Sequence, residues 1–166
     1  MNTSTRVESV KKRSGRPPEN LKNEIRIELP SNSINEGLAR SIASVFISQL
    51  DPTFEELADI KCAVSEAVTN CIVHGYRDTS GVIYITIKIL DERTVRIEVR
   101  DRGCGIDDIK TAMQPLYTTD REGERSGMGF TVMESFTDRL SVVSSPGKGT
   151  KITMIKTLGE GRRSAK

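Results

Sequence analysis

The stretch SEAVTNCIVHGY, at residues 65–76, decides the fold of this chain. We expect it to form the C-terminal part of a helix. In a helix, Glu66 and Asn70, which are four residues apart, project from one face. Three glycine-bracketed segments follow in order, namely RDRGCGI at 100–106, RSGMGF at 125–130 and SPGKGT at 145–150. Each of these signals is weak alone, but their joint order predicts a single nucleotide site.

The helical pair offers two kinds of chemistry toward a nucleotide. Magnesium keeps several waters and takes few protein ligands, so the amide oxygen of Asn70 and triphosphate oxygens can complete its octahedron. The carboxylate of Glu66, one turn away, can orient a hydroxyl nucleophile against the terminal phosphate. Without the later segments, the same pair would more often be an exposed polar helix face. His74 continues this face, and we expect it to be helix-end structure rather than a base.

The glycine segments fit the other parts of a nucleotide. Asp101 follows an expected strand, where its carboxylate can accept a hydrogen bond from an adenine amino group. Gly103 and Gly105 let the backbone pass close to the base. Gly127 and Gly129 precede an expected helix, whose N-terminal amides would face the phosphates. The sequence therefore predicts adenine at the first of these segments and phosphate at the second.

Other nucleotide and metal motifs are missing or incomplete. The run GKGT at 147–150 resembles a Walker loop, but glycine follows its lysine where serine or threonine is required. The motifs of ordinary protein kinases are missing, and the segment after Asp101 lacks the later acidic ligands of a calcium loop. One histidine and three cysteines without C-x-x-C spacing do not predict a zinc site. Cys62, Cys71 and Cys104 are expected to be small apolar fillers in a reducing cytosol.

Length and composition predict one modest domain. The 166 residues, 36% hydrophobic and 4% aromatic, support a single core at residues 24–158. Residues 1–23 are expected to be a disordered basic extension and residues 159–166 a flexible tail, since both lack apolar periodicity. A net charge of +2 and no tryptophan favour no direct nucleic-acid partner. No apolar run suits a membrane span or a signal peptide, which predicts a cytoplasmic protein without membrane contact.

Apolar periodicity within the domain changes between strand and helix. Alternation predicts strands at 24–29, 82–90, 94–100, 140–144 and 150–158, and the helical period predicts helices at 36–50, 53–74, 107–113 and 129–136. The first helix should bury Leu38, Ile42, Val45, Phe46 and Leu50, and the second Leu57, Ile60, Val64, Ala67, Val68 and Cys71. Residues 114–126 are polar and long enough for a mobile lid. These elements predict an α+β fold, a two-layer α/β sandwich with a mixed, mostly antiparallel sheet and helices on one face.

The order of these segments resembles the Bergerat ATP-binding fold of histidine kinases, gyrase-like ATPases, Hsp90 chaperones and a small group of bacterial serine kinases. A closer resemblance, over about residues 24–156, is to the sporulation anti-sigma-F factors, a family of serine protein kinases. It rests on LDPTFEELADIKCAVSEAVTNCIVHGY at 50–76, QPLYTTDREGERSGMGF at 114–130 and TVMESFTDRLSVVSSPGKGT at 131–150. The resemblance implies a homodimer that binds sigma-F with ATP, blocks its use by RNA polymerase, and phosphorylates a serine of an anti-anti-sigma protein.

The resemblance also implies roles for single residues. Glu66 would be the catalytic base, Asn70 the ligand of Mg²⁺, and Arg40 a contact to both protein partners. ATP or ADP would be bound by Asn70, Asp101, Gly103, Gly105, Thr118, Thr119, Arg125, Ser126, Gly127, Met128, Gly129 and Thr150. The first strand and its neighbourhood would form the dimer contact. The chain departs from the family in its N-terminal extension, since family members usually begin near Asn23.

Other functions compete with this interpretation. A sensor histidine kinase would need a phosphoacceptor histidine on a preceding helical hairpin, and a gyrase-like clamp would need a further transducer domain. The related stress-response anti-sigma kinase is disfavoured by the match at 114–130. A module that binds sigma-F with ATP but transfers no phosphate is disfavoured by Glu66, because nucleotide binding alone has no need of a base.

Overall fold

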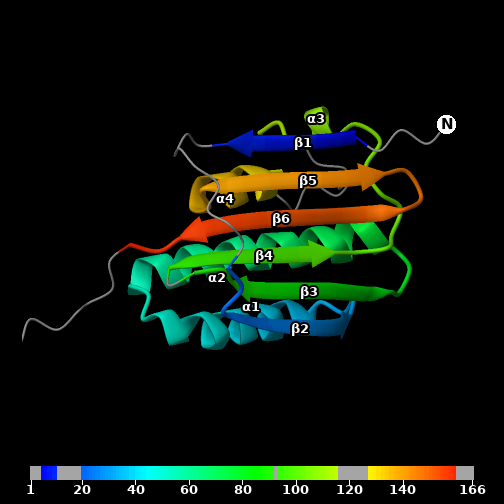
Figure 1. The fold of residues 1–166 in the computed structure, drawn as a ribbon. Coiled ribbons are helices and arrows are strands. Elements are labelled where there is room, and N and C mark those ends of the chain that lie inside the picture. Colours follow the sequence, from blue (N-terminus) through cyan, green and yellow to red (C-terminus); the bar gives the residue numbers. More distant parts are fainter. Residues whose placement is uncertain (1–4, 11–19, 92, 116–126, 160–166) are drawn as a thin grey trace, which may run out of the picture.

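In the part of the chain that the structure describes, six strands form one sheet, and helices cover one of its faces. The structure is a computed structural model that describes residues 5–10, 20–91, 93–115 and 127–159. The strand order is β1-β5-β6-β4-β3-β2, and α1, α2 and α4 lie behind the sheet in the view of Figure 1. The fold therefore has two layers, with the core between the sheet and the helices.

Pairs of strands alternate with pairs of α-helices along the chain. The strands are β1 (Thr5–Val10), β2 (Asn23–Pro30), β3 (Val82–Ile89), β4 (Thr94–Arg100), β5 (Arg139–Ser145) and β6 (Gly149–Thr157). The α-helices are α1 (Ile34–Ile47), α2 (Phe54–Asn70), α3 (Ile109–Ala112) and α4 (Gly129–Phe136). A 3₁₀ turn, η1 (Ser48–Leu50), ends α1, and a π-helical turn, η2 (Cys71–Tyr76), ends α2.

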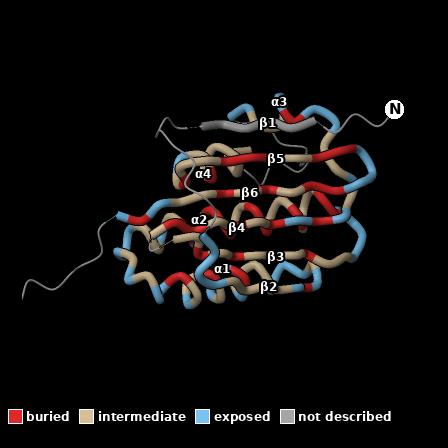
Figure 2. Tube along the Cα trace, in the orientation of Figure 1, coloured by how far each residue is buried: buried red, intermediate tan, exposed pale blue. Residues whose placement is uncertain are grey.

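The predicted fold class is confirmed, with one correction to the sheet. Every strand pair in the described part of the chain is antiparallel, so the sheet is not mixed. In β3, Ile83, Ile85, Ile87 and Ile89 are buried and alternate with less buried residues, as a half-covered strand requires. Figure 2 shows buried positions along the central strands and exposed ones concentrated in the connecting loops.

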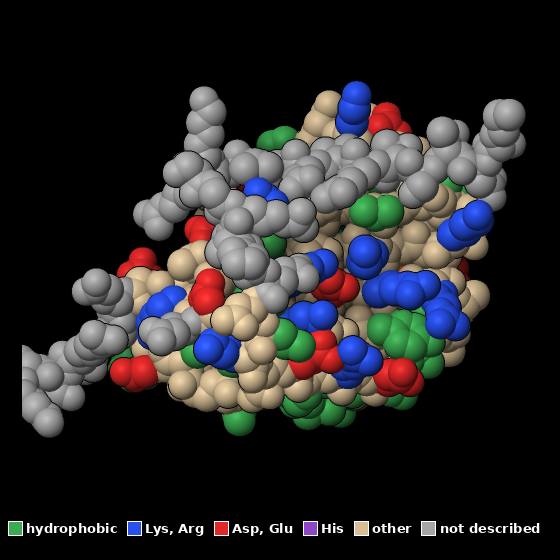
Figure 3. Space-filling view, in the orientation of Figure 1, with side chains coloured by type: hydrophobic (Ala, Val, Ile, Leu, Met, Phe, Trp, Pro, Cys, Tyr) green, Lys and Arg blue, Asp and Glu red, His purple; other side chains and the backbone are tan. Residues whose placement is uncertain are grey.

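The face of the sheet away from the helices is polar. Figure 3 shows Lys, Arg, Asp and Glu side chains spread over it. Some of them pair across strands: Lys88 lies 3.1 Å from Glu24, and the guanidinium of Arg102 lies 5.0 Å from the centroid of the Tyr84 ring. Buried and less buried residues therefore alternate along the strands because one face of the sheet packs on the helices and the other faces solvent.

Within the described residues, no helix combines the length and apolar character that crossing a bilayer requires.

The buried side of α1 differs from the predicted one. Leu38 and Val45, expected in the core, are 47% and 76% exposed, whereas Ala39, Ala43 and Ile47 are fully buried. The buried residues are four apart, and two of them are alanines, which lets α1 pack closely on α2. Hydrophobicity predicted that the larger apolar side chains of α1 are buried, but the close contact between α1 and α2 requires small side chains. The larger apolar side chains are consequently left at the surface.

The prediction of disorder over residues 1–23 is wrong for residues 5–10, and Asn23 also lies in a strand, as the first residue of β2. Thr5–Val10 form β1, which pairs antiparallel with β5 from Thr5 opposite Ser144 to Val10 opposite Arg139. A strand added at a sheet edge is held by backbone hydrogen bonds, which need no apolar periodicity in the sequence. This explains why composition alone predicted disorder. Residues 116–126 of the lid predicted at 114–126, and residues 160–166 of the tail predicted at 159–166, lie outside the described residues.

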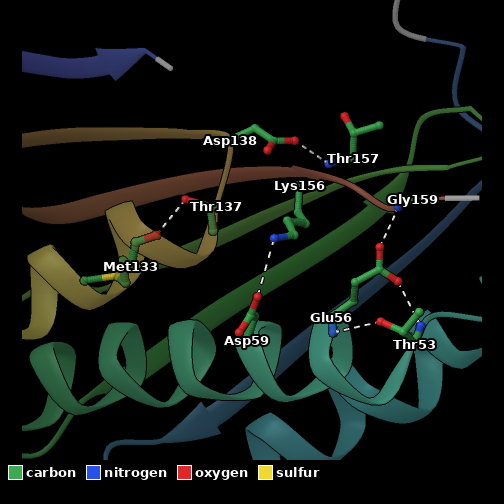
Figure 4. Close-up of polar contacts among 9 residues, drawn as sticks. All are labelled: Thr53, Glu56, Asp59, Met133, Thr137, Asp138, Lys156, Thr157 and Gly159. Atoms are coloured by element: carbon green, nitrogen blue, oxygen red, sulfur yellow. Dashed lines mark hydrogen bonds and ion pairs between the residues drawn. The ribbon is translucent and has the colours of Figure 1, made fainter. Parts of the chain in front are cut away.

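The start of α2 is fixed by a capping box that also holds the C-terminal segment (Figure 4). The Thr53 hydroxyl accepts the Glu56 N–H at 3.2 Å, and the Glu56 carboxylate accepts the Thr53 N–H at 2.8 Å. Glu56 also accepts a hydrogen bond from the Gly159 N–H. Burial raises the pKa of Glu56, but the bonds from Thr53 and Gly159 outweigh it and lower the pKa overall. One turn later, Asp59 lies 3.6 Å from Lys156 of β6, so α2 is tied to the sheet at two points.

Thr53→Ala should reduce the free energy of unfolding by about 1 kcal/mol, because it leaves the Glu56 N–H without its cap. Urea unfolding would measure the loss. The control is Ser41→Ala in the middle of α1, where the hydroxyl only donates to the Gly37 carbonyl at 2.7 Å. Alanine is the better helix former there, so its effect should stay within about 0.5 kcal/mol. Equal losses in the two variants would show that the cap contributes nothing specific.

Candidate functional site

A cleft of about 440 Å³ opens between the C-terminal end of α2, the loop after β4, α3 and the start of α4. Ligand pockets in proteins typically measure roughly 300–1,000 Å³, so the cleft can hold a nucleotide. Helix α2 brings its polar face to this cleft. Ile60, Val64 and Val68 of α2 are buried as expected, so the opposite face of the helix is turned away from the core. Glu66 and Asn70 are both half-buried and both line the cleft. The prediction that these two side chains share one face is therefore confirmed.

The π-helical turn at Cys71–Tyr76 shapes the inner wall of the cleft. It carries the backbone of Gly75 against the loop after β4, where the Gly75 carbonyl accepts the Cys104 N–H at 2.8 Å. A Cβ on Gly75 would lie 2.9 Å from Cγ of Asp101, and a Cβ on Gly103 would lie 2.0 Å from the Gly75 oxygen. Only glycine at both positions permits this contact. Turns of this kind occur frequently at functional sites.

Two further glycines close the loop against the β5–β6 hairpin. Gly105 has φ +73°, and a Cβ there would lie 2.1 Å from the carbonyl oxygen of Ser145. Gly149 has φ +80°, and a Cβ there would lie 2.2 Å from the carbonyl oxygen of Asp101. In the structure, both glycines bring segments of the protein close to one another. Gly105, which was predicted to let the backbone pass close to a base, also lines the cleft.

Asp101 lies at the bottom of the cleft and is 2% exposed. Its Oδ1 accepts the Gly103 N–H at 2.8 Å and the Thr150 N–H at 3.3 Å. Burial raises the pKa of Asp101, while the backbone bonds from Gly103 and Thr150 and the neighbouring Cys71 thiol oppose this rise. Burial and the nearby Asp101 carboxylate raise the pKa of the Cys71 thiol well above its usual value. Asp101 is thus a desolvated carboxylate held in one orientation.

Ser144 links the loop after β4 to the start of β6. Its buried hydroxyl accepts the Ile106 N–H at 2.9 Å and donates to the Gly149 carbonyl at 3.0 Å. The Thr150 hydroxyl lies 2.9 Å from it, and Thr150 lines the cleft. The sequence analysis did not select Ser144, since a serine within a strand carries no signal of such a role. Its hydrogen bonds fix the loop and the hairpin relative to each other.

The start of α4 lies against the polar face of α2. A Cβ on Gly129 would lie 3.0 Å from Oε2 of Glu66 and 3.3 Å from Oδ1 of Asn70. Glycine therefore leaves space at the point where the carboxylate and the amide meet the helix N-terminus. Among the described residues, no group of three or more His, Cys, Asp or Glu side chains is placed to hold a metal ion.

Most of the predicted site residues meet in this cleft. Those that line it are Glu66, Asn70, Asp101, Gly105, Gly127, Met128, Gly129 and Thr150. Gly103 is not among the lining residues, because it packs behind Asp101 on the Gly75 backbone. Thr118, Thr119, Arg125 and Ser126 lie outside the described residues. The lining residues that the sequence analysis did not select for the site are Thr69, His74, Gly75, Arg77, Ile106, Asp107, Asp108, Ala112, Phe130 and Ile152.

Arg40 lies away from the cleft, on the exposed side of α1. Its side chain is 47% exposed, and its guanidinium lies 3.6 Å from the carboxylate of Glu36. Glu36 in turn accepts a hydrogen bond from Ser65 of α2. Leu38 on the same helix is also exposed. Arg40 is therefore at the surface, as the sequence predicted, beside apolar residues that the sequence placed in the core.

Known proteins that resemble this chain share one kind of domain. The family described as a histidine kinase-like ATPase domain matches residues 29–156. An anti-sigma F factor from Caldanaerobacter subterraneus subsp. tengcongensis is 54% identical over 140 residues, which are 84% of this chain and 97% of that protein. The anti-sigma F factors of Clostridium acetobutylicum and Anoxybacillus flavithermus are 52% and 48% identical, over 82% and 83% of this chain and 94% of each relative.

The fold also resembles a crystal structure of the RsbU and RsbW domains of a Mycobacterium tuberculosis protein. The two share a TM-score of 0.62 and 22% identity over 87% of this chain. The match spans 35% of the longer chain. At this identity, the likeness concerns the fold alone.

We predict that the buried Asp101 carboxylate makes nucleotide binding depend on pH and on the base. We expect ATP to bind far better than GTP, by up to about 10⁴-fold, because GTP offers no 6-amino group to Asp101. As pH falls through the raised pKa of Asp101, the carboxylate is protonated and loses its accepting charge, so ATP affinity should fall. Asp101→Asn should weaken ATP binding by about 1–3 kcal/mol and remove this pH dependence.

Calorimetric titration with ATP and GTP over a range of pH would measure both effects. Asp107→Asn is the matched control, since Asp107 lines the same cleft but is exposed. It removes an equal charge without removing a buried acceptor. Equal affinities for ATP and GTP, or an unchanged pH profile in Asp101→Asn, would exclude Asp101 as the group that reads adenine.

Proposed function

The chain belongs to the anti-sigma F factor family, whose domain is a histidine kinase-like ATPase domain, and we propose that it is an ATP-dependent anti-sigma factor with serine kinase activity. In this proposal, it binds sigma-F with ATP, blocks its use by RNA polymerase, and phosphorylates a serine of an anti-anti-sigma protein to inactivate it. It thereby regulates sporulation transcription in the cytoplasm. The observation that carries the proposal is the meeting of Glu66, Asn70 and Asp101 in one cleft.

The proposed nucleotide lies with its base at the closed end of the cleft. The Asp101 carboxylate accepts a hydrogen bond from the adenine 6-amino group, and this buried acceptor supplies base selectivity. The backbone amides at Gly127, Met128 and Gly129 face the phosphates at the start of α4. Thr118, Thr119, Arg125 and Ser126 complete the phosphate contacts in this proposal, as the family resemblance implies.

Asn70 is the proposed ligand of Mg²⁺. The ion, bound together with the nucleotide, supplies positive charge that offsets the charge developing on the transferred phosphoryl group. An amide oxygen suits it because Mg²⁺ prefers oxygen ligands and keeps most of its waters. The space in front of Asn70, which a Cβ on Gly129 would fill, supports this assignment.

Glu66 is the proposed general base. Its carboxylate orients the hydroxyl of the acceptor serine and takes its proton as the serine oxygen attacks the γ-phosphorus. A new bond forms between that oxygen and phosphorus, the bond from phosphorus to the β–γ bridging oxygen breaks, and ADP leaves. The position of Glu66 beside Asn70 and the N-terminus of α4 supports this role.

The protein partners are proposed to bind at α1. Arg40 is exposed there, and Ile34 and Leu38, which are 82% and 47% exposed, add apolar area to the same helix. Such a mixture of arginine and apolar side chains is typical of protein interfaces. The homodimer contact is proposed at β2, which has a neighbour on one side only among the described strands. An unpaired strand edge of this kind favours association.

The second candidate is an ATP-dependent sigma-binding module without kinase activity, or a stress-response anti-sigma kinase. Glu66 in the cleft favours a kinase over the passive module, because a carboxylate beside the phosphates would only repel them if no proton were to be moved. The curated relatives at 48–54% identity carry the name anti-sigma F factor, which favours sigma-F over a stress-response sigma factor.

Glu66→Gln should lower phosphate transfer by about 10²- to 10⁴-fold, because the amide cannot take the serine proton. ATP binding and sigma-F binding should persist. Labelled ATP with the purified anti-anti-sigma partner would measure transfer, and calorimetry would measure binding. Asn70→Ala is the comparison: it should weaken magnesium-nucleotide binding itself. Near-parental transfer by Glu66→Gln would exclude Glu66 as the base.

Arg40→Ala should weaken sigma-F binding and partner phosphorylation together, by about 2 kcal/mol if Arg40 is an interface hot spot. Folding should be unaffected, since an exposed ion pair contributes at most about 1 kcal/mol and Glu36 keeps its bond from Ser65. Pull-down with sigma-F and a kinase assay on the same variant are the measurements. Arg96→Ala is the matched control, an ion-paired arginine of β4. If both variants behave like the parent, α1 is not the binding surface.

A further inference from the structure

The buried hydroxyl of Ser144 lies where three segments around the cleft meet. Ser144 is 3% exposed on β5, and Thr150 is its direct partner on β6. Its Oγ accepts the Ile106 N–H at 2.9 Å and donates to the Gly149 carbonyl at 3.0 Å. The Oγ1 of Thr150 lies 2.9 Å from the same oxygen. Ile106 and Thr150 line the cleft and Ser144 does not, so Ser144 can act on a ligand only through these neighbours.

The contacts of Ser144 determine which hydroxyl donates. A serine hydroxyl has one proton and two acceptor lone pairs. The Gly149 carbonyl can only accept, so the proton of Ser144 is directed at it. The hydrogen bond between the two hydroxyls therefore takes its proton from Thr150. The Ile106 N–H and the Thr150 O–H occupy both acceptor positions of Ser144, which leaves its hydroxyl fully used within the protein.

The direction of the Thr150 proton determines what Thr150 offers a nucleotide. With this proton directed at Ser144, the Thr150 hydroxyl presents only lone pairs to the cleft. Thr150 also lies beside Asp101, since its N–H is 3.3 Å from the Asp101 Oδ1 and its carbonyl accepts the Asp101 N–H at 2.9 Å. The closed end of the cleft thus holds two neighbouring acceptors, a carboxylate and a hydroxyl oxygen. An amino group, which has two N–H donors, is complementary to this pair.

We propose that Ser144 is a positioning residue that makes the closed end of the cleft selective for adenine, by fixing the Thr150 hydroxyl as an acceptor. The inference rests on the proposed function, in which the base binds at this end beside Asp101. A purine with a 6-oxo group presents an acceptor there and meets two further acceptors. Without Ser144, the Thr150 hydroxyl can rotate and donate to that oxo group. Ser144 thus acts on the choice of base more than on nucleotide binding in general.

Affinities of the full chain for ATP and for inosine triphosphate, which has a 6-oxo group in place of the 6-amino group, separate this role from packing. Ser144→Ala should lower the ratio of ATP to inosine triphosphate affinity about three- to tenfold, the effect of one net hydrogen bond. A residue that only packs the loop against the hairpin would weaken both nucleotides alike and leave the ratio unchanged. Ser141→Ala, on the opposite face of the same strand, is the control and should keep the parental ratio.

Thr150→Val tests whether Ser144 acts through Thr150, since valine has no hydroxyl to be oriented. In the Thr150→Val background, Ser144→Ala should change the ratio by less than about twofold, because the two substitutions remove the same interaction. An unchanged ratio in Ser144→Ala alone would overturn the inference. An equally large further change in the Thr150→Val background would do so too, because Ser144 would then act by another route.

Thermal unfolding of each variant comes first, and Ser144→Cys, which keeps the shape with a much weaker hydrogen-bonding group, replaces Ser144→Ala if the alanine variant does not fold. Asp101→Asn is titrated in parallel. If Asp101→Asn keeps the parental ratio of ATP to inosine triphosphate affinity, adenine recognition at this end of the cleft fails and the inference fails with it. If Asp101→Asn lowers the ratio and Ser144→Ala does not, the proposed function stands and this inference alone is wrong.

Discussion

Three close contacts between backbone segments hold the site together. Gly103 lies against Gly75, Gly105 against Ser145, and Gly149 against Asp101, and a Cβ at any of these glycines would lie 2.0–2.2 Å from a carbonyl oxygen. Because the segments approach so closely, they exclude water from Asp101 and supply backbone donors to its carboxylate. The buried end of the cleft therefore depends on glycine at these three positions, because any side chain there would prevent the close contacts.

The cleft has two ends with different electrostatics. Asp101 is desolvated at the closed end, which raises its pKa and strengthens any hydrogen bond it makes to a ligand. Glu66 and Asn70 are half-buried and face the open space before α4. A single element, α2 with its π-helical turn, contributes residues to both ends of the cleft and so sets the distance between them.

The close packing of α1 on α2 determines which apolar side chains remain at the surface. Ala39 and Ala43 let α1 approach α2 closely, and this packing leaves Leu38 and Val45 outside. Exposed apolar side chains cost little in a monomer but offer area for a partner. The sheet edges differ in a similar way: β1 covers β5 on one side, whereas β2 has no described neighbour beyond it. The exposed apolar side chains of α1 and the open edge of β2 are therefore the parts of the described surface that other elements cover least.

The sequence by itself determined the element types, the α+β class and the residues that meet at Glu66, Asn70 and Asp101, because periodicity and glycine spacing are local properties of the chain. Tertiary structure alone decided which side of α1 is buried, that β1 joins the sheet, and that Gly103 packs behind Asp101 and not along the cleft. Each of these depends on a segment distant in sequence. A local pattern shows that a residue is small or apolar, but not which neighbour it will meet.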